Sequence, residues 1–367
     1  MSSRHSCACS RPANPATWPR LRTASRLSRS SRVRPAARPT ATAQRAMSEI
    51  TVHTLDDSRR DEWRRFVAES NNGTVFHDPL FLDYHPADRF RFRHLLFTRD
   101  DVVLAALPGG VVKDEYRSPL GASFGGFVFA AGLSLKDADA VVNAFLGWCR
   151  REGIGAATLT PPMQVYHRTP DDVIEYSMLY NGFRLHNALY SSVIDFSRIR
   201  SKADLSRNTR HRINQSINKH VRIVQRNELE RFYPILLENK AKFDTKPTHT
   251  LEELQRLEEL LPGMMTLFMA YRGDEPIAGE LLFAANDRCI LNFYTMHRYE
   301  HRNLFAVNYL VEHAIRWCVA QGYRYYDYGV SADTFSDNPM EPSWSLVRFK
   351  ESMGSTGCMR TTYRWTA

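Results

Sequence analysis

Apolar residues recur along this chain at two different spacings, which predicts strands and helices in alternation. The clearest part is a strand–helix–strand unit. Residues 289–296 are rich in β-branched, aromatic and aliphatic side chains, which is typical of a strand. Over residues 304–319 the apolar positions lie three or four apart and form one face of a helix. Gly322 is placed to end that helix, and residues 323–328 predict a second strand.

The other elements follow the same alternation in both halves of the chain. In the first half we expect strands at residues 49–55, 92–98, 102–112, 124–130, 156–160 and 183–196, and helices at 57–70, 134–151 and 171–180. In the second half we expect further strands at 221–224, 264–271, 276–284 and 358–365, and further helices at 201–219, 228–243, 250–261 and 343–352. Thr250 and Glu253 have the spacing of a capping box at a helix start. This order predicts an α/β (α+β) chain of two similar units, with mixed sheets flanked by helices.

The loop between the first strand and the helix of the clearest unit is basic. Arg298, His301 and Arg302 all lie in it. The free N–H groups and the positive dipole end of a helix start suit an anionic ligand such as a pyrophosphate. We therefore place the active centre at this loop.

Charge is distributed unevenly along the chain. The 367 residues carry 49 Lys and Arg and 40 Asp and Glu, a net charge of +9. Residues 1–46 hold ten of the arginines and no acidic residue, so 39 basic and 40 acidic residues remain beyond them, a net charge of −1. A nearly neutral body argues against a broad nucleic-acid surface, and we expect no DNA partner.

The first 47 residues are rich in Arg, Ser and Pro and predict a disordered extension, because five prolines exclude a long helix. Two explanations stay open. The segment could be a transit peptide, or Met47 could be the true start. We favour Met47, since the prolines disrupt an amphipathic targeting helix.

Cysteine and hydropathy patterns indicate a cytoplasmic protein. The six cysteines show neither CxxC nor metal-ligand spacing, as expected of reduced thiols. The longest charge-free run, residues 118–135, holds four Gly and a Pro and is too broken for a membrane span of about 20 residues. We expect no metal site either, because the histidines of the basic stretches lack ligand spacing; these are His211, His220, His297 and His301.

Several stretches of the second half together resemble the Fem-type branch of the GNAT superfamily. They are KPTHTLEEL from Lys246, AGELLF around Glu280, GYRYYDYGVS around Asp327, and RFKESMGS around Lys350. The resemblance extends over about residues 48–367. It implies two tandem GNAT-like domains, at 48–196 and 197–367, with acyl transfer in the second or at the seam between them.

The resemblance also implies where a donor would bind. In GNAT enzymes a glycine-rich loop holds the pyrophosphate of acyl-CoA. The matching region here, HRYEHRNLFA, has no glycine, and only Arg302 and Ala306 fit the first and last places. The Fem-type enzymes for bridge peptides use aminoacyl-tRNA and carry a long helical arm, whereas the helices here are interrupted at Lys246 and Pro247. The residues expected at the cofactor are Arg298, Arg302, Asn303, Ala306 and Asn308.

Acyl transfer to an amine needs a base, a site for the oxyanion and an acid for the leaving group. Glu280 and Asp327 are the carboxylates best placed as base or substrate anchor, and burial would raise their pKa values. Each has an alternative: a cross-strand ion pair for Glu280, and capping of the turn at Gly329 for Asp327. Tyr294 and Tyr326 are candidate general acids or ordinary sheet residues.

Other candidates would bind substrate. Ser331 and Lys350 are expected at a phosphate or carboxylate of the substrate, although Lys350 could instead be solvated. Residues 198–226 hold nine basic residues and one acid with a narrow apolar stripe, which predicts a basic amphipathic helix. Arg207 and Arg210 on it would dock a phosphorylated substrate or a tRNA end, or form a solvated face.

These features predict an N-acyltransferase. Its acyl-CoA co-substrate, such as acetyl-CoA, would lie across the start of the 304–319 helix, in a cleft between Glu280 and Asp327. The acceptor would be an amine, for example on an amino sugar or peptide of the cell envelope. The rivals are tRNA-dependent transfer and a non-catalytic binding protein. The acyl group, the acceptor and the oligomeric state stay open, and no tightly bound cofactor is expected.

Overall fold

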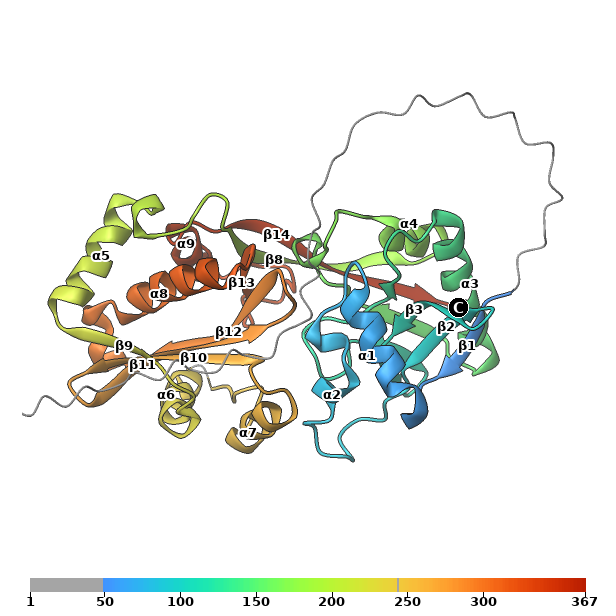
Figure 1. The fold of residues 1–367 in the computed structure, drawn as a ribbon, viewed down its shortest axis with the longest axis horizontal. Helices are drawn as coiled ribbons and strands as arrows, with labels where there is room; N and C mark the ends of the chain where they lie inside the picture. Colours follow the sequence, from blue (N-terminus) through green and yellow to red (C-terminus); the bar gives the residue numbers. More distant parts are fainter. Residues whose placement is uncertain (1–48, 243) are drawn as a thin grey trace, which may run out of the picture.

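Two sheets organise the residues that the computed structural model describes, which are 49–242 and 244–367 (Figure 1). The predicted extension, residues 1–47, lies outside them. The smaller sheet has the order β1 (Thr51–Thr54), β2 (Leu95–Arg99), β3 (Val102–Leu107), β6 (Val128–Phe129). The larger, ten-stranded sheet has the order β4 (Gly110–Val112), β5 (Glu115–Ser118), β7 (Ala156–Leu159), β14 (Thr356–Thr366), β8 (Arg184–Asp195), β13 (Tyr325–Val330), β12 (Cys289–His297), β11 (Glu275–Ala284), β10 (Met265–Arg272), β9 (Val221–Gln225).

Helices cover both sheets. Those of the first half are α1 (Arg60–Glu69), α2 (Pro79–Leu82), α3 (Leu135–Arg151) and α4 (Val173–Tyr180). Those of the second half are α5 (Arg207–Asn218), α6 (Leu229–Ala241), α7 (Leu251–Leu260), α8 (Ala306–Gln321) and α9 (Trp344–Ser352). The alternation of elements and the mixed ten-stranded sheet confirm the predicted α/β class, while the smaller sheet is antiparallel throughout. Among the helices of the described residues, none is long and apolar enough to cross a membrane.

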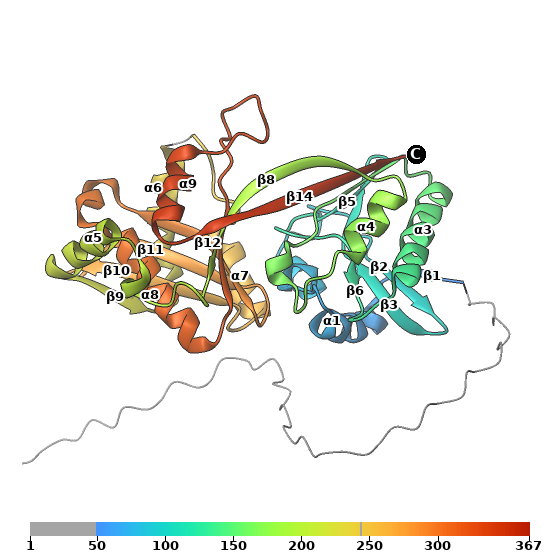
Figure 2. The ribbon, with the colours of Figure 1, turned by 90° about the horizontal axis from the view of Figure 1, so that it is seen from above.

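Two long strands join the halves of the molecule. β8 and β14 pair antiparallel over most of their length and run side by side from one half into the other (Figure 2). The far end of β14 pairs with β7, so the last strand of the chain belongs to the sheet region built by the first half. The predicted boundary between residues 196 and 197 stays a prediction.

The two faces of the large sheet carry different helices. On one face α8 packs Leu310 and Ala314 against Leu282 of β11 and Tyr326 of β13. The other face carries α6 and α7, and its core also includes Phe81, Tyr166 and other residues of the first half. Because this second core contains side chains from both halves, the halves share buried apolar surface at their seam.

Local chemistry explains two of the predicted element ends. Thr250 and Glu253 form the predicted capping box at the start of α7. Gly322 ends α8 in the left-handed conformation, with φ of 87°, as predicted. Two expectations were wrong. The strand expected at 102–112 is split by Pro108–Gly109 into β3 and β4, which belong to different sheets. The helix expected from residue 201 begins at Arg207, because a short turn precedes it and Ser206 caps it.

The large sheet opens between β12 and β13. These parallel strands pair only from Cys289 to Leu291, opposite Tyr325 to Asp327. Beyond Leu291 the pairing of β12 with β11 shifts register, which leaves Phe293 as an extra residue in a β-bulge. A bulge bends its strand, and here it lies where β12 and β13 diverge.

Candidate functional site

A cavity of about 200 Å³ lies where β12 and β13 diverge. It is at the seam, because the first half, both strands and the long pair β8–β14 all contribute to it. Its lining residues are Ser123, Phe124, Ser191, Leu291, Asn292, Phe293, Asp327, Tyr328, Gly329, Val330 and Arg360. The cavity therefore combines one carboxylate and one guanidinium with hydroxyl, amide and aromatic groups.

Asp327 is the carboxylate of the cavity, and its side chain is buried. Oδ2 accepts a hydrogen bond from the Tyr166 hydroxyl at 2.6 Å. Oδ1 accepts from the Ser191 hydroxyl at 2.8 Å and from the Gly329 backbone N–H at 2.8 Å. Three donors make burial of the charge tolerable. Asp327 thus caps the Gly329 turn, as one alternative predicted, and it also lines the cavity. Its role as base or substrate anchor stays a prediction.

Lys350 of α9 forms hydrogen bonds to the end of β13. Its ammonium donates to the backbone carbonyls of Gly329, at 2.8 Å, and Val330, at 3.0 Å. Only 4% of the side chain is exposed, so the solvated alternative is wrong. Burial lowers the pKa of Lys350 to about 8, and the charge of Asp327 partly opposes that shift.

Arg360 of β14 is the cation of the cavity, and sequence reasoning missed it. Its guanidinium lies 4.9 Å from the centre of the Phe124 ring and donates to the backbone carbonyl of Ser123. Burial lowers its pKa, while Asp327 and Tyr166 act in the opposite direction. An alternating strand such as MRTTYRW does not show which of its arginines faces a cavity, so the sequence carried no usable signal.

Glu280 does not share the cavity with Asp327, and the predicted cleft between the two is wrong. Adjacent residues of a strand point to opposite faces. Tyr326 therefore faces α8 while Asp327 faces the seam, and Glu280 lies on the Tyr326 side. There Glu280 accepts from the Tyr326 hydroxyl and, at 3.0 Å, from the Asn292 amide. Glu280 forms no ion pair with any of the described residues, so the alternative of a cross-strand ion pair is wrong.

Burial has the largest effect on the pKa of Glu280. It raises the pKa of Glu280 to about 8, against the two hydrogen bonds, and raises that of Tyr326 well above its usual value. Asn292 lines the cavity and bonds to Glu280, so Glu280 touches the site only through Asn292.

Tyr294 lies in the core with α6 and α7, outside the lining of the cavity. Its hydroxyl accepts from the backbone N–H of His249 at 3.3 Å and lies 3.2 Å from His249 Nδ1. Burial raises its pKa to about 12. These contacts hold the loop before α7, and its predicted acid function stays a prediction.

The loop expected to bind the donor is held by protein contacts. Arg298 donates to the Pro276 carbonyl at 3.0 Å and pairs with Glu238 at 3.2 Å. Asn308 is buried and donates to Met353 Sδ at 3.5 Å, and Ala306 is buried as well. Arg302 and Asn303 are exposed.

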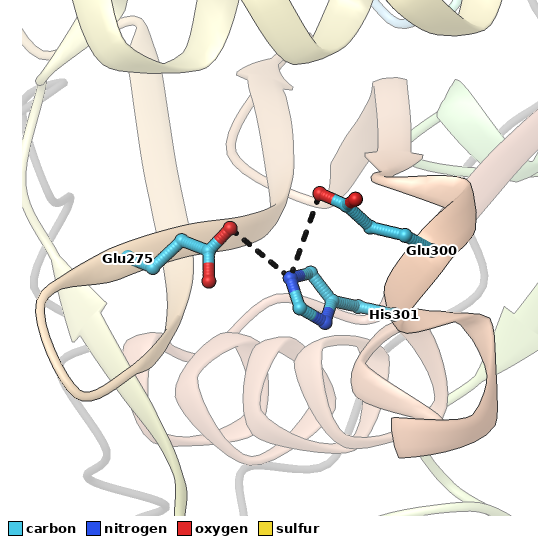
Figure 3. Close-up of side chains that lie close together, drawn as sticks. All are labelled: Glu275, Glu300 and His301. Atoms are coloured by element: carbon cyan, nitrogen blue, oxygen red, sulfur yellow. Dashed lines mark hydrogen bonds and ion pairs between the residues drawn. The ribbon is translucent and has the colours of Figure 1, made fainter.

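A cluster of one histidine and two carboxylates lies beside this loop. Figure 3 shows His301 between Glu275, 3.1 Å away, and Glu300, 3.8 Å away. Both carboxylates are exposed. The cluster ties the loop to the start of β11, and nothing else in the described residues points to a ligand there.

The remaining predicted residues lie apart from the cavity lining. Arg207 on α5 is exposed, whereas Arg210 donates to the backbone carbonyls of Ala203 and Leu205. Ser331 is buried directly after β13, and its hydroxyl has no hydrogen-bond partner among the described residues. The structure thus brings Asp327 and Lys350 to one strand end and leaves Glu280, Tyr294 and the arginines elsewhere.

Comparison with known proteins identifies a domain in the second half and similar folds. Residues 203–337 match a family model described as an acetyltransferase (GNAT) domain. No curated protein matches the sequence. Among solved structures, FemX has 12% identity and a TM-score of 0.64, over 86% of this chain and 97% of that one.

Two further structures have the same arrangement. L-PGS from Bacillus licheniformis has 12% identity and a TM-score of 0.55, over 86% of this chain and 92% of that one. A tandem GNAT protein from the clavulanic acid biosynthesis pathway has 11% identity and a TM-score of 0.52, over 87% and 98%. At these identities the likeness concerns the fold, which is that of tandem GNAT proteins. The match of residues 203–337 indicates a GNAT acetyltransferase domain in the second half of the chain, and the fold as a whole is similar to those of FemX and the tandem GNAT protein.

Proposed function

We propose that the chain transfers an acyl group from acyl-CoA to an amine in the cavity between β12 and β13. The observation that carries the proposal is a buried, triply hydrogen-bonded carboxylate at a cavity where two parallel strands diverge. The match of residues 203–337 to an acetyltransferase domain supports a thioester donor.

Asp327 is the proposed proton acceptor. Oδ1 already accepts two hydrogen bonds and Oδ2 accepts one, whereas a carboxylate offers about four lone-pair sites. Ser191 lines the cavity and donates to Asp327, so the proton of the acceptor ammonium reaches Asp327 directly or through the Ser191 hydroxyl. Tyr166 keeps the carboxylate in place from the first half.

The oxyanion would form beside β12. Pairing between β12 and β13 ends at Leu291, and Asn292 and Phe293 then line the cavity. Backbone N–H groups on this edge are the candidate donors to the tetrahedral intermediate. Lys350 holds the Gly329 and Val330 carbonyls and so keeps the opposite wall in position.

A tRNA-linked donor is the rival, and the exposed basic face of α5 favours it. Arg207 is exposed there, and Arg212 and Lys219 lie near the Phe305 ring at the start of α8. The proposed acceptor, an amine of a cell-envelope precursor, is compatible with either donor. Loss of activity on neutralising Arg207 and Arg212, with no response to acyl-CoA, would support the rival.

The test measures release of free CoA thiol from a panel of acyl-CoAs with amine acceptors. Asp327→Asn should lower kcat by about 100-fold or more, because the variant lacks the proton acceptor. Asp195→Asn is the matched control, since Asp195 is on β8, outside the cavity lining, and pairs with Arg324 at 3.4 Å. Wild-type turnover in D327N would refute the assignment. If no acyl-CoA of the panel reacts, the proposal that the donor is an acyl-CoA is refuted.

A further inference from the structure

Arg360 lines the cavity and carries a donor without a protein partner. Its Nε is buried and has no hydrogen-bond partner among the described residues. No carboxylate of those residues lies within ion-pair distance of its guanidinium, although it is held against Phe124 and the Ser123 carbonyl. A buried guanidinium usually has an anionic partner, because desolvating the charge is otherwise costly. The missing partner can come from a ligand.

Asp327 supplies the opposite charge in the same cavity. Protein donors occupy three of the about four acceptor sites of Asp327, and Asp327 forms no ion pair with Arg360. The charge of Asp327 stabilises the Arg360 guanidinium, but the two groups lie beyond ion-pair distance. A cavity with one negative and one positive group that do not form an ion pair is complementary to a ligand that carries both charges. Its volume of about 200 Å³ can hold an amino-acid-sized group.

We propose that the acceptor is a small amino acid with both ends free. Its carboxylate binds the Arg360 guanidinium, and its ammonium faces the side of the cavity formed by Asp327 and Ser191. The proposal rests on the proposed acyl transfer and assigns the amine to a free amino acid instead of an amino sugar or a peptide of the cell envelope. A planar guanidinium held on an aromatic ring presents its donors in a fixed direction, which suits a carboxylate.

The reaction on such an acceptor balances as follows. The ammonium transfers one proton to Asp327, and the free amine attacks the thioester carbonyl. A C–N bond forms and the C–S bond breaks. The second proton lost by the nitrogen goes to the departing CoA thiolate, and Asp327 releases its proton to water. The products are an N-acyl amino acid, CoA thiol and one proton.

Binding to the full chain without any donor tests the inference. Titration calorimetry would use glycine, alanine and serine, with their amides and their N-acetyl derivatives. We expect the free amino acid that fits to bind about 10- to 100-fold more tightly than either blocked form, because each blocked end loses a charged hydrogen bond. Equal binding of an amino acid and its amide, or no binding by any free amino acid at millimolar concentration, would overturn the inference.

A variant pair gives the second test. Arg360→Gln should weaken binding of the free amino acid about 10- to 100-fold and leave binding of the amide unchanged. Arg364→Gln is the control, since Arg364 is on the same strand but pairs with Glu115. Should R360Q fail to fold, the comparison of acid and amide on the wild type decides alone.

The two proposals fail in different ways. If free amino acids bind through Arg360 but no acyl-CoA reacts, the thioester donor is wrong and the zwitterion site stands. If R360Q acylates amino acids and carboxylate-free amines at wild-type rates, the zwitterion site is wrong and the acyltransferase proposal stands.

Discussion

Replacing Glu280 by Gln should change how stability depends on pH. Glu280 is fully buried, and burial raises its pKa to about 8 from an ordinary value of 4.5. Gln has the same shape, and its amide oxygen can accept from Tyr326 and Asn292 as Oε1 does. The new NH₂ group replaces Oε2, which has no partner among the described residues. The variant therefore removes the titration while keeping the two hydrogen bonds.

The direction in which stability changes with pH follows from the number of protons that each state binds. Between pH 4.5 and 8 the unfolded glutamate is ionised while the native one keeps its proton. The native state then binds more protons, so stability falls as pH rises through this window. The difference of about 3.5 pH units, at about 1.36 kcal/mol each, corresponds to a loss of about 5 kcal/mol. Between pH 5 and pH 8 the loss should be about 3–4 kcal/mol.

Urea denaturation at half-unit intervals from pH 5 to 8.5 measures this effect. Over that range the free energy of unfolding of the wild type should fall by about 3–4 kcal/mol more than that of Glu280→Gln, while the slope of the unfolding free energy against urea concentration stays the same. A constant offset of about 1–3 kcal/mol is also expected, because the buried NH₂ group lacks acceptors. Glu259→Gln is the control for removing a carboxylate, since Glu259 is exposed on α7. Parallel curves for wild type and E280Q would refute the idea that Glu280 is buried as a neutral acid.

Two further changes test other parts of the structure. Between pH 8 and 10.5 the unfolded Lys350 is still charged, whereas the buried one, with a pKa of about 8, has lost its proton, so the wild type should gain about 3 kcal/mol of stability over this range. Lys350→Met should abolish that gain. Urea denaturation at both ends of the pH range measures it, and an unchanged gain in the variant contradicts the burial of Lys350. Thr250→Ala should destabilise the chain by about 1 kcal/mol through loss of the capping box on α7; thermal unfolding with no shift contradicts that cap.

Much of the chain's local structure could be predicted from its sequence. The period of apolar residues located the strand at 289–296, the helix that follows it and the strand at 323–328, which are β12, α8 and β13. The same local chemistry predicted the cap at Thr250 and the helix end at Gly322. These features depend on residues a few positions apart, which the sequence shows directly.

The candidate site was only partly predictable. Asp327 and Lys350 lie in stretches that resemble Fem-type proteins, and both are at the end of β13. Strand periodicity alone implies that Tyr326 and Asp327 face opposite ways. Glu280 could lie on the same face of the sheet as Tyr326 or on the same face as Asp327. The register of β11, β12 and β13 decides between them, and the sequence does not show that register.

Sequence by itself determined most of the elements and several of their ends, and its resemblance to GNAT proteins indicated the class of chemistry. Only the tertiary structure brought Tyr166, Ser191 and Arg360 to Asp327, because it pairs β8 with both β13 and β14 and packs the first half against the second. Burial, and with it the shifted pKa values of Glu280 and Lys350, also depends on those distant contacts. Helix and strand patterns arise from neighbouring residues, whereas a cavity forms from groups that only the complete fold brings together.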